Sequence, residues 1–402
     1  MNRNCVTLSL FLGTALAGSL TSLAAQELNA GTFANLTFRQ IGPINMSGRI
    51  VDIAVVESNP FTFYVASATG GVWKTTNNGV TFEPVFENEG THSVGAIAVH
   101  QLDTNVVWVG TGERASRQSS SWGDGVYKST DGGETWSNMG LRDSHHIGRI
   151  AMHPTDPDVV FVAAMGHLWG PNEERGLYVT TDGGRNWTRT LHVDENTGVV
   201  DVALDPWDPS IVYAATYQRR RRPHGFHGGG PGSGLYKSTD GGRTWRRLTA
   251  GLPDGDIGRI GISVYRSDPR IVYVSVEQGY RYNASTAYGE RRAGVYRSED
   301  RGETWLHMSD WNPRPMYASQ ILVDPSDDQR IYMLNSYSYS DDGGKTFTAV
   351  RTSLHGDDRL VWVNPADSRH VMKADDGGLG ISYDRGRRWL YMTHLPVSQW
   401  YR

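Results

Sequence analysis

The sequence predicts an all-β fold, a β-propeller of four-stranded blades for which seven blades are expected. Three observations lead to this prediction. An octapeptide recurs seven times, a short strand-like run precedes each copy, and the intervening segments alternate with the period of two typical of strands. The copies, called boxes here, follow the pattern Ser/Thr-x-Asp-x-Gly-x-Thr-Trp and are TTNNGVTF (75–82), STDGGETW (129–136), TTDGGRNW (180–187), STDGGRTW (238–245), SEDRGETW (298–305), SDDGGKTF (340–347) and SYDRGRRW (382–389).

Each residue type in the box suits a tight turn. The Ser/Thr and Asp oxygens can accept hydrogen bonds from backbone N–H groups, and Gly permits a positive φ. The aromatic ring supplies buried area between neighbouring sheets. We therefore expect a structural and not a catalytic role for the acidic or amide position of every box, namely Asn77, Asp131, Asp182, Asp240, Asp300, Asp342 and Asp384.

The segments between boxes have a constant internal order. In the third repeat, residues 147–154 predict an inner strand A, 159–164 a strand B and 176–180 a strand C, and the box leads into a short outer strand D that contains the aromatic. Arg49, Arg149 and Arg259 each follow Gly at the start of a strand A. We expect these guanidinium groups to bond carbonyls of the neighbouring blade around a central channel.

The extra length of the longer repeats predicts a functional face. In an up-and-down blade the A–B and C–D turns lie on one side, and the B–C loops and D–A links lie on the other. The surplus residues fall in the B–C loops of blades two to five, at 111–124, 165–175, 216–233 and 276–293. Because long loops on a rigid scaffold often carry function, we expect the binding site on the B–C side.

The first residues and the composition suggest an exported protein. Residues 1–25 have the layout of a secretory signal peptide, so a secreted or periplasmic location is expected, with a propeller over 26–402 and no integral membrane segment after cleavage. The single cysteine, Cys5, would leave with that peptide, so no disulfide is available. A formal net charge of −4 argues against nucleic acid as a partner.

Acidic, basic and aromatic side chains are frequent in the predicted loops. Aromatic platforms flanked by acids suit sugars, and paired carboxylates can hydrolyse a glycosidic bond when they are held at a suitable separation. The alternative is that these groups form salt bridges between long loops. The catalytic candidates are Glu113, Asp124, Glu173 and Glu174, and the ligand-binding candidates are Arg117, Trp122, His167, Trp169, Arg175, Arg219 and Tyr280.

For two further groups of residues we favour an interpretation without a binding role. The basic run 219–222, followed by His224 and His227, suits an anion, but a solvated surface loop is the favoured interpretation. His145 and His146 are adjacent on an extended chain, so their side chains point apart, and no Cys-rich or His-rich motif accompanies them. We therefore expect no metal site and no cofactor.

The boxes, together with residues 47–79, 119–136 and 146–176, resemble the bacterial secreted Asp-box (BNR) repeat proteins related to the sortilin N-terminal propeller. The resemblance covers nearly the whole chain after the signal peptide. It extends more distantly to xyloglucanases and sialidases, which share the box. It implies a propeller of WD40/YVTN-like repeats and, through the sortilin relationship, a peptide-binding role.

The xyloglucanase resemblance carries an implied catalytic pattern that this chain lacks. Those enzymes bind substrate between two seven-bladed propellers and place an acidic base in blade one, two residues before a Gly-Gly pair. The pair here is Gly70-Gly71, and the aligned position is Ala68. The base is therefore missing. This chain also contains the blades of a single propeller, which cannot complete a cleft that lies between two propellers.

The two ends of the repeat region bear on ring closure. If residues 36–43 pair with the seventh blade, the ring closes at seven blades, which is our choice. Otherwise open edges require more blades or a partner chain. The final residues 395–402 are typical of an outer strand followed by the start of another blade, which suggests a C-terminal truncation.

The preferred hypothesis is a module that binds an extracellular glycan or peptide through the B–C loops. A xyloglucanase-like glycoside hydrolase and a structural or assembly propeller are the alternatives.

Overall fold

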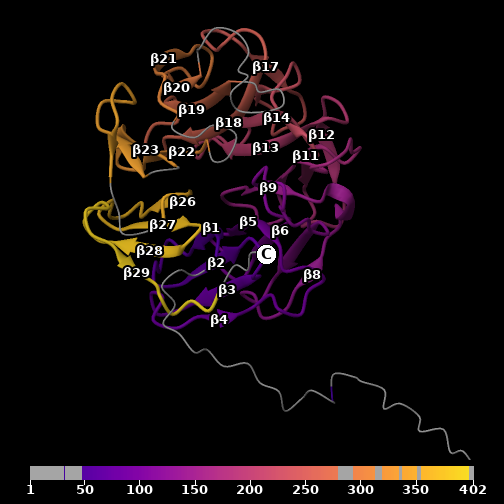
Figure 1. Cartoon of the computed structure of the whole chain (residues 1–402), viewed down its shortest axis with the longest axis vertical. Coiled ribbons are helices and arrows are strands. Elements are labelled where there is room, and N and C mark those ends of the chain that lie inside the picture. Colours follow the sequence, from indigo (N-terminus) through magenta and orange to yellow (C-terminus); the bar gives the residue numbers. More distant parts are fainter. Residues whose placement is uncertain are drawn as a thin grey trace, which may run out of the picture. The chain divides into compact units, whose positions relative to one another are not determined.

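The computed structural model describes Gly31 and residues 48–278, 293–312, 319–334, 337–350 and 355–397. The chain divides into two units, Met1–Ile41 and Gly42–Arg402, and the fold described here belongs to the second. It is a ring of seven antiparallel sheets, each built on a meander of four strands (Figure 1). The predicted seven-bladed propeller is confirmed. The predicted signal peptide and the segment 36–43 lie outside the described residues.

The first four blades follow the chain without crossovers. Their strands are β1 (Ile50–Val55), β2 (Phe63–Ser67), β3 (Val72–Thr75) and β4 (Glu83–Pro84); β5 (Val94–Val99), β6 (Val107–Thr111), β7 (Val126–Ser129) and β8 (Ser137–Asn138); β9 (Ile147–Met152), β10 (Val160–Ala164), β11 (Gly176–Thr180) and β12 (Thr188–Leu191); and β13 (Thr197–Leu204), β14 (Val212–Arg222), β15 (Gly225–Gly228), β16 (Gly234–Ser238) and β17 (Arg246–Leu248).

The remaining three blades repeat the same order. Their strands are β18 (Ile257–Val264), β19 (Val272–Gln278), β20 (Gly294–Ser298) and β21 (Leu306–Ser309); β22 (Ile321–Asp324), β23 (Asp327–Met333), β24 (Ser338–Ser340) and β25 (Thr348–Ala349); and β26 (Asp358–Val363), β27 (Val371–Asp375), β28 (Gly378–Ser382) and β29 (Leu390–Tyr391). The predicted A, B and C strands of blade three are confirmed as β9, β10 and β11. The aromatic residue of the box, however, lies just before strand D and not within it. In blade three, for example, Trp187 immediately precedes β12.

The hydrophobic core lies between blades. Each of the seven apolar clusters joins two neighbouring sheets, because a single four-stranded sheet cannot bury both of its faces alone. The cluster that closes the ring joins β1 and β2 to the strands of blade seven, and Figure 1 shows these indigo and yellow sheets side by side.

The C-terminal residues before 398 help to close this seam. Leu395 and Val397 are buried in the cluster between blades seven and one, and the Gly48 backbone N–H donates to the Val397 carbonyl at 2.6 Å. Residues 395–397 therefore pack at this seam, and residues 398–402 lie outside the described part of the chain, so the predicted start of another blade stays a prediction. Blade seven obtains its outer strand from β29.

The box is a turn stabilised by its own side chains. In the second box the Ser129 hydroxyl donates to Asp131 Oδ1 at 2.7 Å and accepts the Gly133 N–H at 2.8 Å. Asp131 Oδ1 also accepts the Thr135 N–H at 2.9 Å. Equivalent bonds occur in all seven boxes. The expected structural role of the box is thus supported in every blade.

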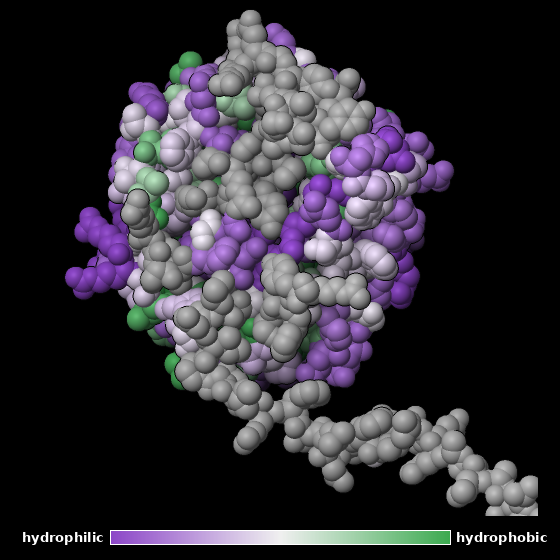
Figure 2. All heavy atoms as spheres, viewed as in Figure 1, coloured by the Kyte–Doolittle hydropathy of each residue, from purple (hydrophilic) through white to green (hydrophobic). Residues whose placement is uncertain are grey.

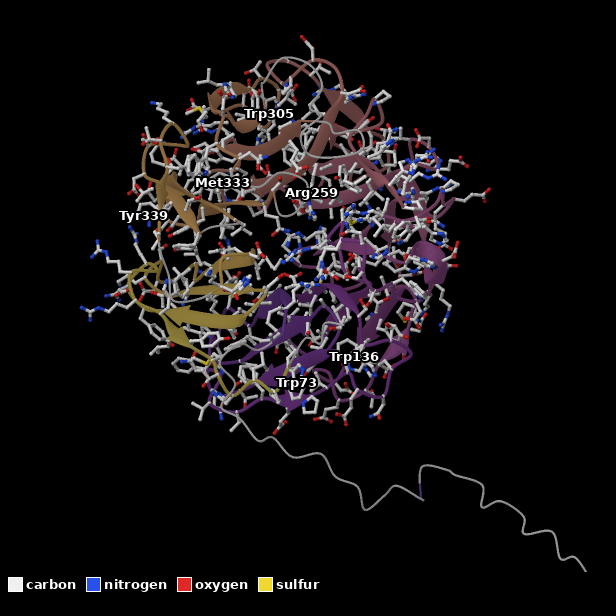
Figure 3. All side chains as sticks on the ribbon, viewed as in Figure 1. Trp73, Trp136, Arg259, Trp305, Met333 and Tyr339 are labelled. Atoms are coloured by element: carbon white, nitrogen blue, oxygen red, sulfur yellow. The ribbon has the colours of Figure 1, made fainter. Side chains whose placement is uncertain are left out.

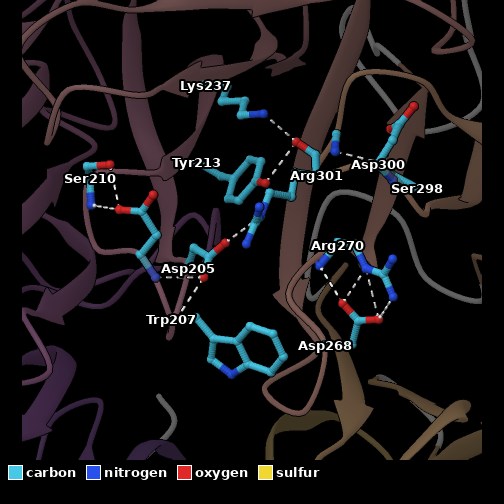
Figure 4. Close-up of polar contacts among 12 residues, drawn as sticks. Asp205, Trp207, Ser210, Tyr213, Lys237, Asp268, Arg270, Ser298, Asp300 and Arg301 are labelled. Carbon is cyan, nitrogen blue, oxygen red and sulfur yellow. Dashed lines mark hydrogen bonds and ion pairs between the residues drawn. The ribbon is translucent and has the colours of Figure 1, made fainter.

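The residue after the box Asp or Asn has a positive φ in each blade. Glycine occupies this position in four boxes, while Asn78, Arg301 and Arg385 adopt φ values of 59°, 57° and 60°. A non-glycine residue in this region is strained, so the turn must be held by its surroundings. The Arg301 carbonyl accepts hydrogen bonds from Tyr213 and Lys237 of the preceding blade, at 2.9 and 2.7 Å (Figure 4).

The boxes also connect consecutive blades. The indole N–H of Trp136 donates to the Val85 carbonyl of blade one at 2.6 Å, and that of Trp187 donates to the Met139 carbonyl of blade two at 2.7 Å. Arg301 adds an ion pair to Asp205 at 3.0 Å, which Figure 4 shows at the seam between blades four and five. Figure 3 places Trp136 and Trp305 away from the ring axis and Arg259 near it.

The arginines expected around the channel pair with carboxylates, which differs from the prediction of carbonyl partners. Arg49 Nη1 lies 2.6 Å from Glu113 Oε1, and Arg149 Nε lies 3.0 Å from Asp201 Oδ1. Arg259 lies near the buried Glu277, whose charge opposes the lowering of the Arg259 pKa by burial. Of these carboxylates, Asp201 lies on the inner strand β13, Glu277 lies in the second strand β19, and Glu113 follows the end of the second strand β6.

Arg114, which was not singled out from the sequence, bonds to carbonyls across the channel. Its guanidinium donates to the carbonyls of Val51 in blade one at 2.7 Å, Gly148 in blade three at 3.4 Å and Arg359 in blade seven at 3.2 Å. The amide of Gln320 in blade six also accepts from it. Burial lowers the Arg114 pKa to about 10, although the charge of Asp52 opposes this shift.

We expect Arg114→Met to destabilise the ring strongly, because several buried acceptors from different blades would lose their donor. The loss should be about 3 kcal/mol or more in the free energy of unfolding, measured by urea denaturation. Arg185→Met is the control, since Arg185 is exposed in the third box. Equal stability of the two variants would contradict a structural role for Arg114.

The box aspartate should tolerate Asn but not Ala at neutral pH. In the first box Asn77 already accepts the Thr81 N–H at 2.9 Å and donates to the Thr81 hydroxyl at 2.9 Å. Asp131→Asn should therefore keep the turn. Asp131→Ala should lose about 1 kcal/mol, a value reduced by solvent exposure. Thermal unfolding of both variants tests this expectation, and equal melting temperatures would contradict it.

Acid should weaken the same turns. Hydrogen bonds from Thr135 and Ser129 lower the pKa of Asp131 from 3.8 to about 2. A lowered pKa in the folded state stabilises the protein above pH 4, and this contribution disappears as the pH falls towards 2. The stability of Asp131→Asn should consequently fall less than that of the wild type between pH 4 and 2, as measured by denaturation at each pH.

Candidate functional site

The B–C loops of blades two and three meet beside the D–A link that joins these blades. This link contains the 3-10 turn η2 (Arg142–Ser144) and His145. The His145 carbonyl accepts the N–H of Gly123 in the loop of blade two at 2.8 Å, and the Met165 N–H of blade three donates to the His146 carbonyl at 2.9 Å. These backbone bonds bring both loops to one place, as predicted for the B–C side. We call the surface formed by Trp122, Asp143, His145, His167 and Trp169 the ring patch.

A row of aromatic rings lies on the ring patch. The Trp122 indole stacks on the His145 imidazole with ring centroids 5.9 Å apart, and His145 stacks on His167 at 3.7 Å. Trp122 is 68% exposed and Trp169, two residues after His167, is 48% exposed. Figure 2 shows one face of the molecule, on which hydrophilic residues gather near the middle. Exposed indoles in polar surroundings are able to bind a ligand with apolar faces.

Asp143 holds the ring patch together. Its Oδ1 lies 3.0 Å from His167 Nε2 and 3.7 Å from His145 Nε2. Its Oδ2 accepts a hydrogen bond from the amide of the buried Asn172 at 2.9 Å. Burial and the neighbouring His167 lower the pKa of His145 below its usual value, while Asp143 opposes the shift. The sequence analysis missed Asp143, although its position two residues before His145 was a usable signal.

Glu113 does not belong to the ring patch. It is fully buried and forms the ion pair with Arg49 near the channel, and Asp376 bridges Arg49 to Arg359 at 3.1 and 2.8 Å. Burial raises the Glu113 pKa, and Arg49 opposes that shift. Glu113 is therefore engaged in an ion pair inside the ring and is not exposed on the surface of the B–C loops.

The other acidic candidates lie in separate environments. Asp124 Oδ2 accepts the Tyr127 hydroxyl at 2.7 Å and lies 3.5 Å from Arg142. Glu173 is exposed. The pKa of Glu174 is raised by burial and by the charge of Asp143, so Glu174 lies close to the ring patch. A neighbour not recognised from the sequence is Glu89, whose pKa is raised by burial and by Asp124.

The arginine candidates support the loops from beneath. Arg175 is buried and donates to the carbonyls of Met165 and Gly170 in its own loop, at 2.8 and 3.1 Å. Arg219 donates to the Ser116 hydroxyl of blade two at 3.3 Å. Burial lowers the pKa of Arg175 to about 10 and that of Arg219 to about 9. These contacts favour loop packing over ligand contact.

The basic run is not a solvated loop, contrary to the favoured interpretation. Residues 219–222 extend β14 and pair with β15 in a hairpin, so alternate side chains face opposite ways. Arg219 and Arg221 are buried, whereas Arg222 is exposed. The period of two was present in the sequence, but the glycines that follow it suggested a flexible loop.

Three further candidates have different outcomes. Arg117 is partly buried, and its side chain donates to the Ser119 hydroxyl at 3.2 Å. Tyr280 lies outside the described residues. His146 is buried with its Nδ1 2.9 Å from the Glu113 carbonyl, and its ring lies edge-on to that of His145 with the centroids 6.4 Å apart. Ala68, the position aligned with the xyloglucanase base, is fully buried at the B–C turn of blade one.

A pocket of about 600 Å³ lies on the opposite side, between blades three and four. Phe161, Val179, Asp182, Asn186 and Asp240 are among its lining residues, so it is formed largely by two boxes. The aspartates there are already engaged in their turns, as the bonds to Asp182 from Thr180 and Asn186 illustrate. The ring patch therefore remains the better candidate site.

Comparisons with known proteins agree on the fold. The family model for sortilin (Sortilin-Vps10, neurotensin receptor 3) matches residues 124–286. An oligoxyloglucan-reducing end-specific xyloglucanase of Emericella nidulans is 23% identical over 250 residues, covering 51% of this chain and 30% of that protein. The chain spans less than a third of the length of the curated relatives that it matches.

Solved structures extend the likeness over most of the chain. The GH74 xyloglucanase of Xanthomonas campestris superposes with a TM-score of 0.65 at 16% identity, covering 88% of this chain and 55% of that one. YCF48 bound to D1 peptide superposes with a TM-score of 0.53 at 14% identity, covering 86% and 98%. Among the described residues no helix is long and apolar enough to cross a membrane. The chain is a seven-bladed β-propeller that is similar to the sortilin family model over residues 124–286 and, at 23–24% identity, to xyloglucanases.

Proposed function

We propose that this propeller binds an extracellular glycan through the ring patch without cleaving it. The observation that carries the proposal is the pair of exposed indoles, Trp122 and Trp169, on adjacent loops. The C–H faces of a sugar ring pack on an aromatic face, and the polar rim supplies hydrogen-bond partners for its hydroxyl groups.

The rigidity of the loops supports a binding role. The backbone bonds from Gly123 and Met165 hold both loops against the link between blades two and three. Arg175 and Arg219 support the same loops from within. A surface that is already ordered loses little conformational entropy on binding, so more of the contact energy is available for affinity.

The acidic groups favour binding over hydrolysis. Glu113 is buried and paired with Arg49, and the position aligned with the xyloglucanase base is Ala68. A glycosidase needs one carboxyl group as acid and a second as base or nucleophile on either side of the bond. Among the described residues of blades two and three, the remaining acidic candidates carry loop contacts or lie at the exposed edge.

One observation keeps the glycoside hydrolase as a second candidate. Burial and the nearby charge of Asp124 raise the pKa of Glu89, and a raised carboxyl pKa suits a general acid. The relatives named as xyloglucanases make xyloglucan fragments the natural substrates to examine. A peptide is the other candidate ligand, since one structural neighbour is named as bound to a peptide.

We expect Trp122→Ala and Trp169→Ala each to weaken glycan binding by at least about tenfold, or ~1.4 kcal/mol, because each removes an aromatic face. A glycan array that includes xyloglucan oligosaccharides would identify a ligand, and calorimetry would measure its affinity for each variant. Release of reducing ends from the same glycans would reveal hydrolysis.

Trp207→Ala is the matched control. Trp207 is 62% exposed in the A–B turn of blade four, on the opposite side from the B–C loops, so its loss should leave binding unchanged. The proposal fails if no glycan binds, if peptides bind instead, or if the control weakens binding as much as the two ring-patch variants do.

A further inference from the structure

Three potential metal ligands come together at the ring patch. One ligand atom each from Asp143, His145 and His167 lies within 4.8 Å of the others. Asp143 and His145 belong to the link between blades two and three, and His167 belongs to the B–C loop of blade three. The sequence predicts no metal site because it pairs His145 only with its neighbour His146, but in the structure the second imidazole comes from His167.

The spacing suits one small cation. Zinc binds imidazole nitrogen and carboxylate oxygen at about 2.0–2.2 Å, so neighbouring ligands of a tetrahedral ion lie about 3.3 Å apart. The distances from Asp143 Oδ1 to the two Nε2 atoms, 3.0 and 3.7 Å, lie on either side of that value. Both Nε2 atoms approach the same carboxylate oxygen. Because the two imidazoles are stacked with 24° between their planes, at least one ring must rotate to direct its in-plane lone pair at the shared cation.

The carboxylate is oriented by a second contact. The Asn172 side chain donates to Asp143 Oδ2 at 2.9 Å and to the Asp143 carbonyl at 3.2 Å, and Asn172 is buried. Oδ1 is therefore the oxygen turned towards the imidazoles. Contacts of this kind are common around metal sites, where they fix the direction of a ligand.

The backbone holds His145 in an uncommon conformation. Its φ is 57°, and Leu141 at the other end of η2 has φ 55°. Left-handed conformations at non-glycine residues persist only where neighbours enforce them, and they concentrate at functional positions. Here the hydrogen bond from Gly123 to the His145 carbonyl holds the residue.

The chemistry of the ligands selects a class of ion. Two imidazoles and one carboxylate suit borderline divalent ions such as Zn²⁺, whereas Ca²⁺ and Mg²⁺ prefer ligand sets made of oxygen. The His145, His167 and Asp143 side chains are 30%, 28% and 63% exposed, so an ion can enter from solvent. Three protein ligands leave one tetrahedral position for water or for a ligand atom.

We propose that Asp143, His145 and His167 form a binding site for one divalent transition-metal ion of the Zn²⁺ class. The site goes beyond the proposed glycan binding, since it requires no glycan. Glu174 is the nearby acidic group, and its charge would add to the attraction for a cation.

Calorimetric titration of the metal-free chain with ZnCl₂ tests the site. We expect one Zn²⁺ ion to bind at this site in the wild type. His145→Ala and His167→Ala should each weaken it by more than about 100-fold, and Asn172→Ala by about 10- to 100-fold through loss of orientation. Titration with CaCl₂ should give no binding at the same position.

His92→Ala is the matched control, because His92 is exposed in the D–A link of blade one and belongs to no described ligand cluster. Circular dichroism would establish that each variant is folded. Visible absorption of the Co²⁺-loaded chain provides a second readout, and its bands should disappear with His167→Ala and persist with His92→Ala. The proposal is overturned if the wild type binds no Zn²⁺, or if the folded His145 and His167 variants bind it as tightly as the control does.

Discussion

The structure depends on closure of the ring between blade seven and blade one. Each blade buries its faces only against its neighbours, so an open ring would leave two sheet faces exposed to water. The cluster formed by β1, β2 and the strands of blade seven prevents this, and Leu395 and Val397 cover part of the seam. Arg114 then connects blade two with blades one, three, six and seven across the axis.

Closure also determines where chemistry can occur. The box turns use their polar side chains to stabilise themselves and the next blade, so their aspartates are not available to a ligand. In the described residues, the B–C loops on the other side do not share this repeated set of stabilising side-chain bonds. Two of them are tied to the link between blades two and three by backbone hydrogen bonds, and this arrangement creates the ring patch.

The charged and aromatic residues of these loops are either buried in supporting contacts or exposed at the surface. Glu113, Arg175 and Arg219 lie inside and hold the scaffold, while Trp122, His167 and Trp169 reach the surface. The difference arises because a long side chain that begins near the channel meets neighbouring blades, whereas one that begins at a loop tip meets solvent. Residue type alone does not reveal which of these applies.

The sequence by itself determined the seven box turns, the order of strands within a blade and the side on which the long loops lie. These features are local, because the box residues bond to one another within a few positions and a strand's period is visible in its own residues. Only the tertiary structure decided that Glu113 pairs with Arg49, that Arg114 spans the channel and that His167 stacks on His145 beside Asp143. Each of these contacts joins different blades, and their distances depend on the closed ring and not on any one repeat.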